Sequence, residues 1–163
     1  MPTTVLLVHG AFADGSSWNH VVARLQAAGV AARTVVNPLR GLTLDGEYVK
    51  SVVTQTDGDV VLVGHSYGGP VATYAGSGRP NVKALVFVSA FGLDQGENAQ
   101  DSGKDYPDAP LLGAIQPWTY PGSDLPELTI TTDNYRRVFA ADLSEADAAL
   151  GACLLYTSDA ADE

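Results

Sequence analysis

The chain has 163 residues, of which 45% are hydrophobic and 17% charged; this is typical of one folded domain and excludes a disordered or membrane-spanning chain. The formal net charge of −10 is concentrated in residues 91–163, which carry fourteen acidic and three basic residues, and this excess argues against nucleic acid as a partner. The N-terminus lacks the basic and apolar segments of a signal peptide, so we expect a cytoplasmic protein with no membrane partner.

Short apolar runs alternate with helical patterns over the first 91 residues. The predicted strands cover 4–10, 30–37, 59–65 and 82–91, and the predicted helices cover 16–29, 43–56 and 67–78. Such alternation is typical of a doubly wound, mostly parallel sheet with helices on both faces. Residues 1–91 are therefore interpreted as the N-terminal part of an α/β core.

The pattern changes after Phe91. Five of the nine prolines lie in 92–128, where we find no further convincing strand, and helices are predicted at 132–143 and 144–152. We interpret 92–150 as a helical cap or lid insertion over the strand ends. Four of its apolar residues are candidates to line a pocket or, alternatively, to attach the lid to the core: Leu111, Leu112, Trp118 and Tyr120.

The pentapeptide GHSYG follows a predicted strand and precedes a predicted helix, so Ser66 lies between two glycines on a sharp turn. Side chains at Gly64 and Gly68 would collide across such a turn, which holds the serine in a strained backbone and turns its hydroxyl outward. The spacing predicts a nucleophile elbow formed by Gly64, His65 and Gly68 around a catalytic Ser66.

Acyl transfer also needs N–H donors for the oxyanion that forms. Tyr67, directly after the nucleophile, offers one amide. The first strand ends in His9-Gly10, and the next residue, Ala11, offers the second, with Phe12 as the neighbouring candidate.

Other interpretations of these glycines fail on particular residues. GAFADGSS is spaced like a phosphate loop, but Ser16 stands where lysine is required, and no dinucleotide-binding glycine pattern is present. With no H-E-x-x-H sequence and a single cysteine, Cys153, we expect neither a metal site nor an internal disulfide.

Taken together, LLVHGAFADGSSW, NPLRG, VVLVGHSYGG and VKALVFVSAF resemble the α/β-hydrolase superfamily, in particular small bacterial hydrolases similar to plant methylesterases and hydroxynitrile lyases. The resemblance covers residues 4 to about 150. It implies a serine hydrolase that acts on small-molecule esters without a cofactor, with Ser66 as the nucleophile and the amides of Ala11 and Tyr67 as the oxyanion hole. Serine rather than aspartate at position 66 argues against epoxide hydrolases and haloalkane dehalogenases.

In that superfamily the acid and the histidine follow the serine along the chain. Here the three histidines are His9, His20 and His65, each with a structural explanation, and none follows the serine. Asp94 is the nearest carboxylate to the strand ends, and the resemblance implies a structural role for it. We therefore expect the base and the acid to be missing and ester turnover to be negligible.

The last residues suggest a reason for the missing groups. The helical pattern before Cys153 breaks into CLLYTSDAADE, which resembles translated adapter read-through in metagenomic reading frames. We interpret 151–163 as a non-native tail on a C-terminally truncated hydrolase whose last strands are missing. An open edge on the fourth strand would make such a chain marginally stable.

Two alternative functions remain open. One is a hydroxynitrile-lyase-like or cofactor-free oxidative enzyme on the same fold. The other is a non-catalytic, ligand-binding pseudo-hydrolase. The intact turn around Ser66 argues against it, because a serine that no longer acts as a nucleophile need not keep a strained backbone.

Overall fold

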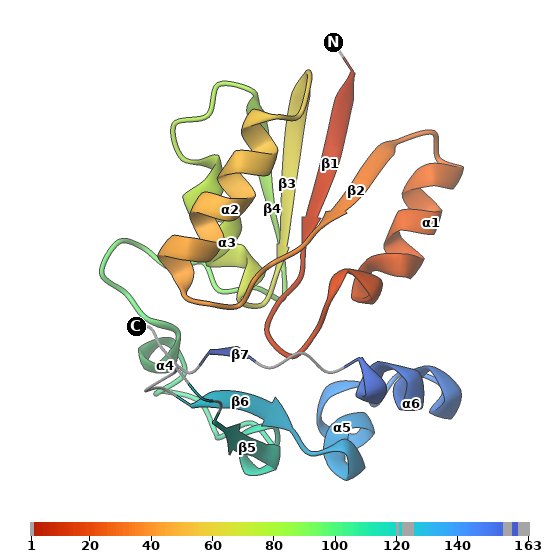
Figure 1. Ribbon diagram of the computed structural model, residues 1–163, viewed down its shortest axis with the longest axis vertical. Coiled ribbons are helices and arrows are strands. Elements are labelled where there is room, and N and C mark those ends of the chain that lie inside the picture. The colour runs from red at the N-terminus through yellow and green to blue at the C-terminus, as the bar shows by residue number, and fades with distance from the viewer. Residues whose placement is uncertain (1, 120, 122–125, 155–157, 160–163) are drawn as a thin grey trace. The chain divides into compact units, whose positions relative to one another are not determined.

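The computed structural model describes residues 2–119, 121, 126–154 and 158–159, and the chain divides into two compact units, Met1–Gly92 and Leu93–Glu163 (Figure 1). The first unit has the strands β1 (Thr3–Val8), β2 (Ala31–Val35), β3 (Asp59–His65) and β4 (Val82–Val88). Its helices are the 3-10 turn η1 (Gly15–Trp18), α1 (Asn19–Ala27), α2 (Leu42–Thr54) and α3 (Gly68–Gly76). The strands and helices predicted for the first 91 residues are therefore confirmed, with shifts of a few residues at their ends.

The four strands of the first unit form one parallel sheet in the order β2-β1-β3-β4. Helix α1 lies on one face of this sheet, and α2 and α3 lie on the other (Figure 1). The predicted doubly wound α/β architecture is confirmed. In such a sheet the central strands are buried on both faces, which explains why β1 and β3 are continuous apolar runs rather than alternating ones.

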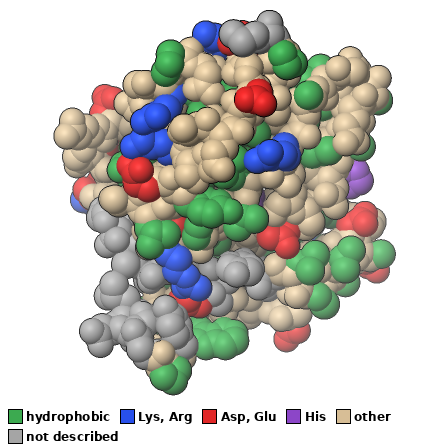
Figure 2. Space-filling view, turned by 45° about the horizontal axis from the view of Figure 1, so that its top comes forward, with side chains coloured by type: hydrophobic (Ala, Val, Ile, Leu, Met, Phe, Trp, Pro, Cys, Tyr) green, Lys and Arg blue, Asp and Glu red, His purple; other side chains and the backbone are tan. Residues whose placement is uncertain are grey.

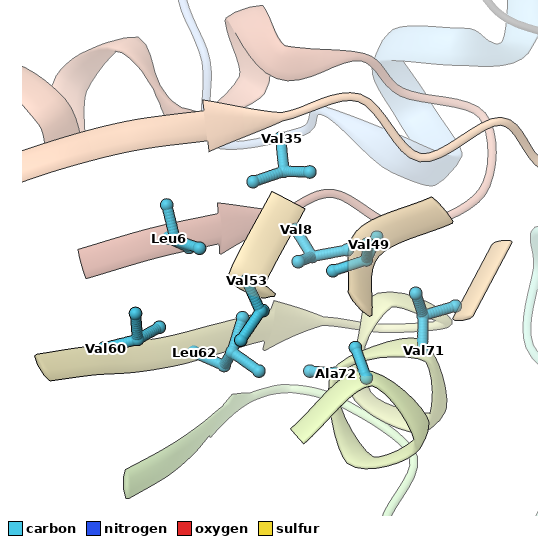
Figure 3. Packing of buried hydrophobic residues seen from close by; sticks show 10 residues of the cluster. Leu6, Val8, Val35, Val49, Val53, Val60, Leu62, Val71 and Ala72 are labelled. Carbon is cyan, nitrogen blue, oxygen red and sulfur yellow. The ribbon is translucent and has the colours of Figure 1, made fainter. Parts of the chain in front are cut away.

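Successive side chains of β1 point to opposite faces of the sheet. Leu6 and Val8 pack with residues of α2 and α3 in the larger core cluster, in which Val49 and Val71 are fully buried (Figure 3). Leu7 points the other way and packs with Trp18 and Val63 beneath α1. The two-residue period of one strand thus supplies both halves of the core.

Strand β4 is an edge of this sheet, as expected from the sequence, and its side chains are poorly covered. Four consecutive hydrophobic residues are between 37% and 45% exposed: Leu85, Val86, Phe87 and Val88. Edge strands of this kind have unpaired backbone groups and tend to associate with other strands.

The second unit contains an antiparallel sheet, which contradicts the expectation that no strand follows Phe91. Its strands are β5 (Ile115–Trp118), β6 (Glu127–Ile130) and β7 (Ser158–Asp159), in the order β5-β6-β7. Its helices are α4 (Ala99–Ser102), the 3-10 turn η2 (Leu112–Ala114), α5 (Thr132–Phe139) and α6 (Glu145–Cys153). The prediction failed because β5 is four residues long and contains Pro117, which a sheet tolerates only on an edge strand such as this one.

Helix α6 is capped at its N-terminus: the amide of Asp147 donates to the Ser144 hydroxyl oxygen at 3.1 Å. The helix continues to Cys153, and Ser158–Asp159 pair with β6. A short strand therefore follows the point at which the helical pattern of the sequence breaks. Residues 155–157 and 160–163 lie outside the described part, and the non-native origin of 151–163 stays a prediction.

Charged side chains of both signs are interspersed over the face seen in Figure 2. Within the described ranges, no helix is long and apolar enough to cross a membrane. Among the same residues, no group of three or more His, Cys, Asp or Glu side chains could hold a metal ion.

Truncation of Leu62 at the centre of β3 should destabilise the first unit. Its side chain is fully buried between the sheet and α2, so Leu62→Ala should lower the free energy of unfolding by about 2–5 kcal/mol. Val36 is 62% exposed, and Val36→Ala should change it by less than about 0.5 kcal/mol. Urea unfolding checks both, and equal midpoints for the two variants would contradict the packing described.

Candidate active site

The candidate site lies where β1 and β3 end side by side at the centre of the sheet, at the lower end of these strands in Figure 1. From β1 the chain continues through α1 to β2, and from β3 it continues through α3 to β4 on the opposite side. The strand order therefore reverses between β1 and β3. Parallel α/β sheets form their ligand crevice at the carboxyl ends of the strands at such a point.

Ser66 directly follows β3 and has a φ of +53°, in the left-handed region that costs a non-glycine residue roughly 1–3 kcal/mol. The turn closes when the amide of Gly69 donates to the Ser66 carbonyl oxygen at 3.0 Å, at the start of α3. The serine is half-buried. The strand, the strained turn and the helix thus have the geometry of a nucleophile elbow.

The glycines on both sides of Ser66 are required by contact between backbones. A Cβ on Gly64 would lie 2.6 Å from the carbonyl carbon of Gly68. A Cβ on Gly68 would lie 2.5 Å from the carbonyl oxygen of Val8 in β1. No side chain fits at either position, so the predicted need for glycine has a direct steric cause.

The loop after β1 also touches the serine. A Cβ on Gly10 would lie 2.7 Å from Cβ and 3.3 Å from Oγ of Ser66. Ala11 follows at once, and the buried Phe12 has a φ of +60°, so the loop turns sharply away from the serine. The backbone of this loop thus runs directly beside the Ser66 hydroxyl, as an oxyanion hole requires.

His9, the histidine next to this loop, is buried and bonded at both ring nitrogens. Its Nδ1–H donates to the carbonyl oxygen of Gly10 at 3.0 Å, and its Nε2 accepts the Asn37 amide at 3.0 Å. The Asn37 side chain in turn donates to the His9 carbonyl oxygen at 3.0 Å. Burial lowers the pKa of His9 below its ordinary value. The neutral His9 ring thus connects the end of β1 with the loop after β2 through hydrogen bonds.

The other two histidines have different surroundings. His65 meets the ring of Trp18 edge-on, with centroids 6.2 Å apart, and burial together with the nearby His9 lowers its pKa. His20 is exposed in the first turn of α1. Within the described part of the chain, no side chain forms a hydrogen bond with the Ser66 hydroxyl.

One buried carboxylate beside the elbow was not singled out from the sequence. Asp45, in the first turn of α2, is fully buried and accepts the Tyr67 hydroxyl at 2.9 Å through Oδ2. Its two oxygens also accept the amide of Arg40 at 3.0 and 3.2 Å. Burial raises the pKa of Asp45, and the hydrogen bonds from Arg40 and Tyr67 oppose that rise. In the sequence it resembles any acidic residue at a helix start, so no local signal could have found it.

The candidates in the second unit stay predictions. Leu111 is half-buried, Leu112 and Trp118 are 59% and 58% exposed, and Tyr120 lies outside the described residues. Asp94 is exposed, and its amide donates to Glu97 Oε2 at 2.8 Å.

The sequence profile of the Alpha/beta hydrolase family matches residues 5–162. The lipase LipV of Mycobacterium tuberculosis is 34% identical over 103 residues, which are 57% of this chain and 40% of the lipase. The crystal structure of polyneuridine aldehyde esterase superposes with a TM-score of 0.81 at 22% identity, over 98% of this chain and 70% of that one. A methylesterase from Arabidopsis gives a TM-score of 0.77 at 18% identity, over 96% and 66%.

A parallel sheet with a strained serine turn at its topological switch point, matched by this profile over nearly all its length, defines the class: the chain belongs to the alpha/beta hydrolase family. The predicted resemblance to that family is therefore confirmed. The match to LipV spans less than half of that lipase.

Replacement of Gly68 should damage the site and the fold together. A Cβ there meets backbone of β1 that cannot move aside, so Gly68→Ala should lower the free energy of unfolding by at least about 2 kcal/mol. A Cβ on Gly92 meets nothing within 4 Å, and Gly92→Ala should be neutral within about 0.5 kcal/mol. Thermal unfolding of the two variants checks this, and a neutral Gly68→Ala would contradict the described approach of α3 to β1.

The lowered pKa of His9 predicts a loss of stability in mild acid. In the unfolded chain His9 takes up a proton near pH 6.5, whereas in the folded protein it is protonated only at a lower pH. The unfolded state therefore binds more protons in this window, and the free energy of unfolding falls as the pH falls below about 6.5. Denaturant unfolding from pH 7.5 to 5.5 measures how steeply the free energy of unfolding changes with pH. His9→Gln should reduce this slope, and replacement of the exposed His20 by Gln should leave it unchanged. An unchanged slope in His9→Gln would contradict the prediction.

Proposed function

We propose that the protein cleaves small carboxylic esters, with Ser66 as the covalent nucleophile and no cofactor. The observation that carries this proposal is the Ser66 backbone: it is held in the left-handed region at the end of β3, and the Gly10 α-carbon lies against its side chain. Such a strained serine persists only where the surrounding structure enforces it. The esterase and lipase names of the relatives support the same class of reaction.

In the proposed reaction the Ser66 Oγ attacks the ester carbonyl carbon and gives its proton to a base. The negative charge that forms on the carbonyl oxygen is stabilised by the amides of Ala11 and Tyr67, with Phe12 as the neighbouring donor. The C–O bond to the alcohol then breaks, the alcohol leaves with the proton, and water hydrolyses the acyl-serine. The positive end of α3, which begins just after Tyr67, adds to this stabilisation.

The base has to come from outside the described site. His9 is bonded at both ring nitrogens and His65 lies against Trp18, so in our proposal these 163 residues alone give negligible turnover. The intact catalyst then uses a histidine that they do not contain. The excess of acidic residues in 91–163 supports the absence of a nucleic-acid partner, because acidic side chains repel phosphate. The proposal further includes a small-molecule substrate, no membrane partner and a cytoplasmic location.

The proposal is tested by labelling with a fluorophosphonate in the presence of imidazole, which can replace a missing base. Attack by Oγ forms an O–P bond and releases fluoride, and imidazole takes the proton. Ser66 should be labelled at a rate that rises with imidazole concentration, and Ser66→Ala should lose this label. Peptide mass spectrometry of the modified chain identifies the labelled serine.

Ser89 provides a matched internal control, because it also has a positive φ (+42°), follows the neighbouring strand β4, and is exposed. If exposure and backbone strain alone made a serine reactive, Ser89 would be labelled as fast as Ser66. Equal labelling of Ser66 and Ser89, or no labelling of Ser66 at any imidazole concentration, would contradict the proposed role.

A further inference from the structure

Helices α2 and α3 are joined by two hydrogen bonds of the same chemical kind. The Tyr67 hydroxyl donates to Asp45 Oδ2 at 2.9 Å, and the Tyr74 hydroxyl donates to Glu47 Oε1 at 3.0 Å. Between the two carboxylates, Gly46 lies directly against the Tyr74 ring, where a Cβ would meet Cγ at 2.6 Å. Three consecutive residues of α2 therefore hold the tyrosines at both ends of α3.

The two bonds differ in their surroundings. Glu47 is exposed, with 51% of its side chain accessible, and also pairs with Lys50 at 2.6 Å. Asp45 is fully buried and is fixed by the amide of Arg40 as well as by the Tyr67 hydroxyl. An exposed pair of this kind contributes little to the free energy of unfolding. A buried carboxylate destabilises the fold unless hydrogen-bond donors are aligned with it, and when they are aligned they hold it rigidly in one position.

The buried bond lies next to the reacting atoms. Tyr67 directly follows Ser66, and its amide is the proposed oxyanion donor. That N–H is part of the peptide between the two residues, so its direction is set by the Ser66 turn on one side and by the Tyr67 Cα on the other. The Tyr67 ring packs against the main core cluster, and its hydroxyl donates to Asp45. The Tyr67 side of the peptide is therefore fixed to α2.

We propose that Asp45 is a positioning residue: through the Tyr67 hydroxyl, it holds the peptide after Ser66 in the direction that aims its N–H at the oxyanion. This inference depends on the proposed ester chemistry at Ser66. It assigns to the first turn of α2 a role in catalysis without contact between Asp45 and the substrate. The bond between Glu47 and Tyr74, at the far end of α3, has no such role.

The test measures the rate constant for fluorophosphonate labelling of Ser66 in the full chain with imidazole. Tyr67→Phe removes only the hydroxyl and should slow labelling about 10-fold, and Asp45→Ala should do the same, because a misdirected donor loses part of its effect. Asp45→Asn keeps an acceptor oxygen and should restore the rate to within about 3-fold of the wild type. Tyr74→Phe removes the matched exposed bond and should label at the wild-type rate.

Thermal unfolding of each variant shows that the rates compare folded proteins, and Tyr67→Phe remains informative if Asp45→Ala fails to fold. Wild-type labelling in Tyr67→Phe would overturn the positioning role while leaving Ser66 as the nucleophile. Equal slowing in Tyr74→Phe would mean that general packing of the helices is responsible, and Asp45→Asn as slow as Asp45→Ala would exclude a hydrogen-bond role; either result overturns the inference. No labelling of wild-type Ser66 would instead reject the proposed function, and this inference with it.

Discussion

The site depends on one steric constraint, the close approach of backbone at the carboxyl ends of β1 and β3. At Gly10, Gly64 and Gly68 a single added carbon would collide with a neighbouring main chain or with Ser66 itself. With no room for side chains, the chain must turn sharply after β3, and the residue at the turn takes a left-handed conformation. The roughly 1–3 kcal/mol of strain at such a residue is sustained by the parallel sheet and the core beneath it, in which Leu6, Val60 and Leu62 are fully buried.

Buried polar groups brace this turn from two sides. On the β1 side, neutral His9 connects the loop after β1 with Asn37 after β2. On the α2 side, Asp45 connects Arg40 with Tyr67 at the start of α3. Buried polar groups are tolerated only when their hydrogen bonds are made, and then they hold one arrangement of their surroundings rather than several. Both networks converge on the residues that flank Ser66, which suits a site whose chemistry requires a fixed backbone.

What the sequence could predict follows the range of the interactions involved. The first four strands and three helices are visible in local periodicity, and Ser66 is visible because its turn needs glycines two positions away on either side. Strand β5 was missed because Pro117 interrupts a four-residue strand, and its partner β6 is just as short. Asp45 was missed because its bond joins residues 22 positions apart. An acidic residue in the first turn of a helix is common for local reasons alone, so nothing in the sequence indicated that Asp45 binds the Tyr67 hydroxyl.

The most direct measurement is a crystal structure of the protein after Ser66 has reacted with a fluorophosphonate, because the phosphoryl oxygen stands where the oxyanion of an ester would form. We expect this oxygen to lie within hydrogen-bond distance, about 3 Å, of the amide nitrogens of Ala11 and Tyr67. A phosphoryl oxygen that points to solvent, with both amides turned away from it, would show that these amides do not form an oxyanion hole.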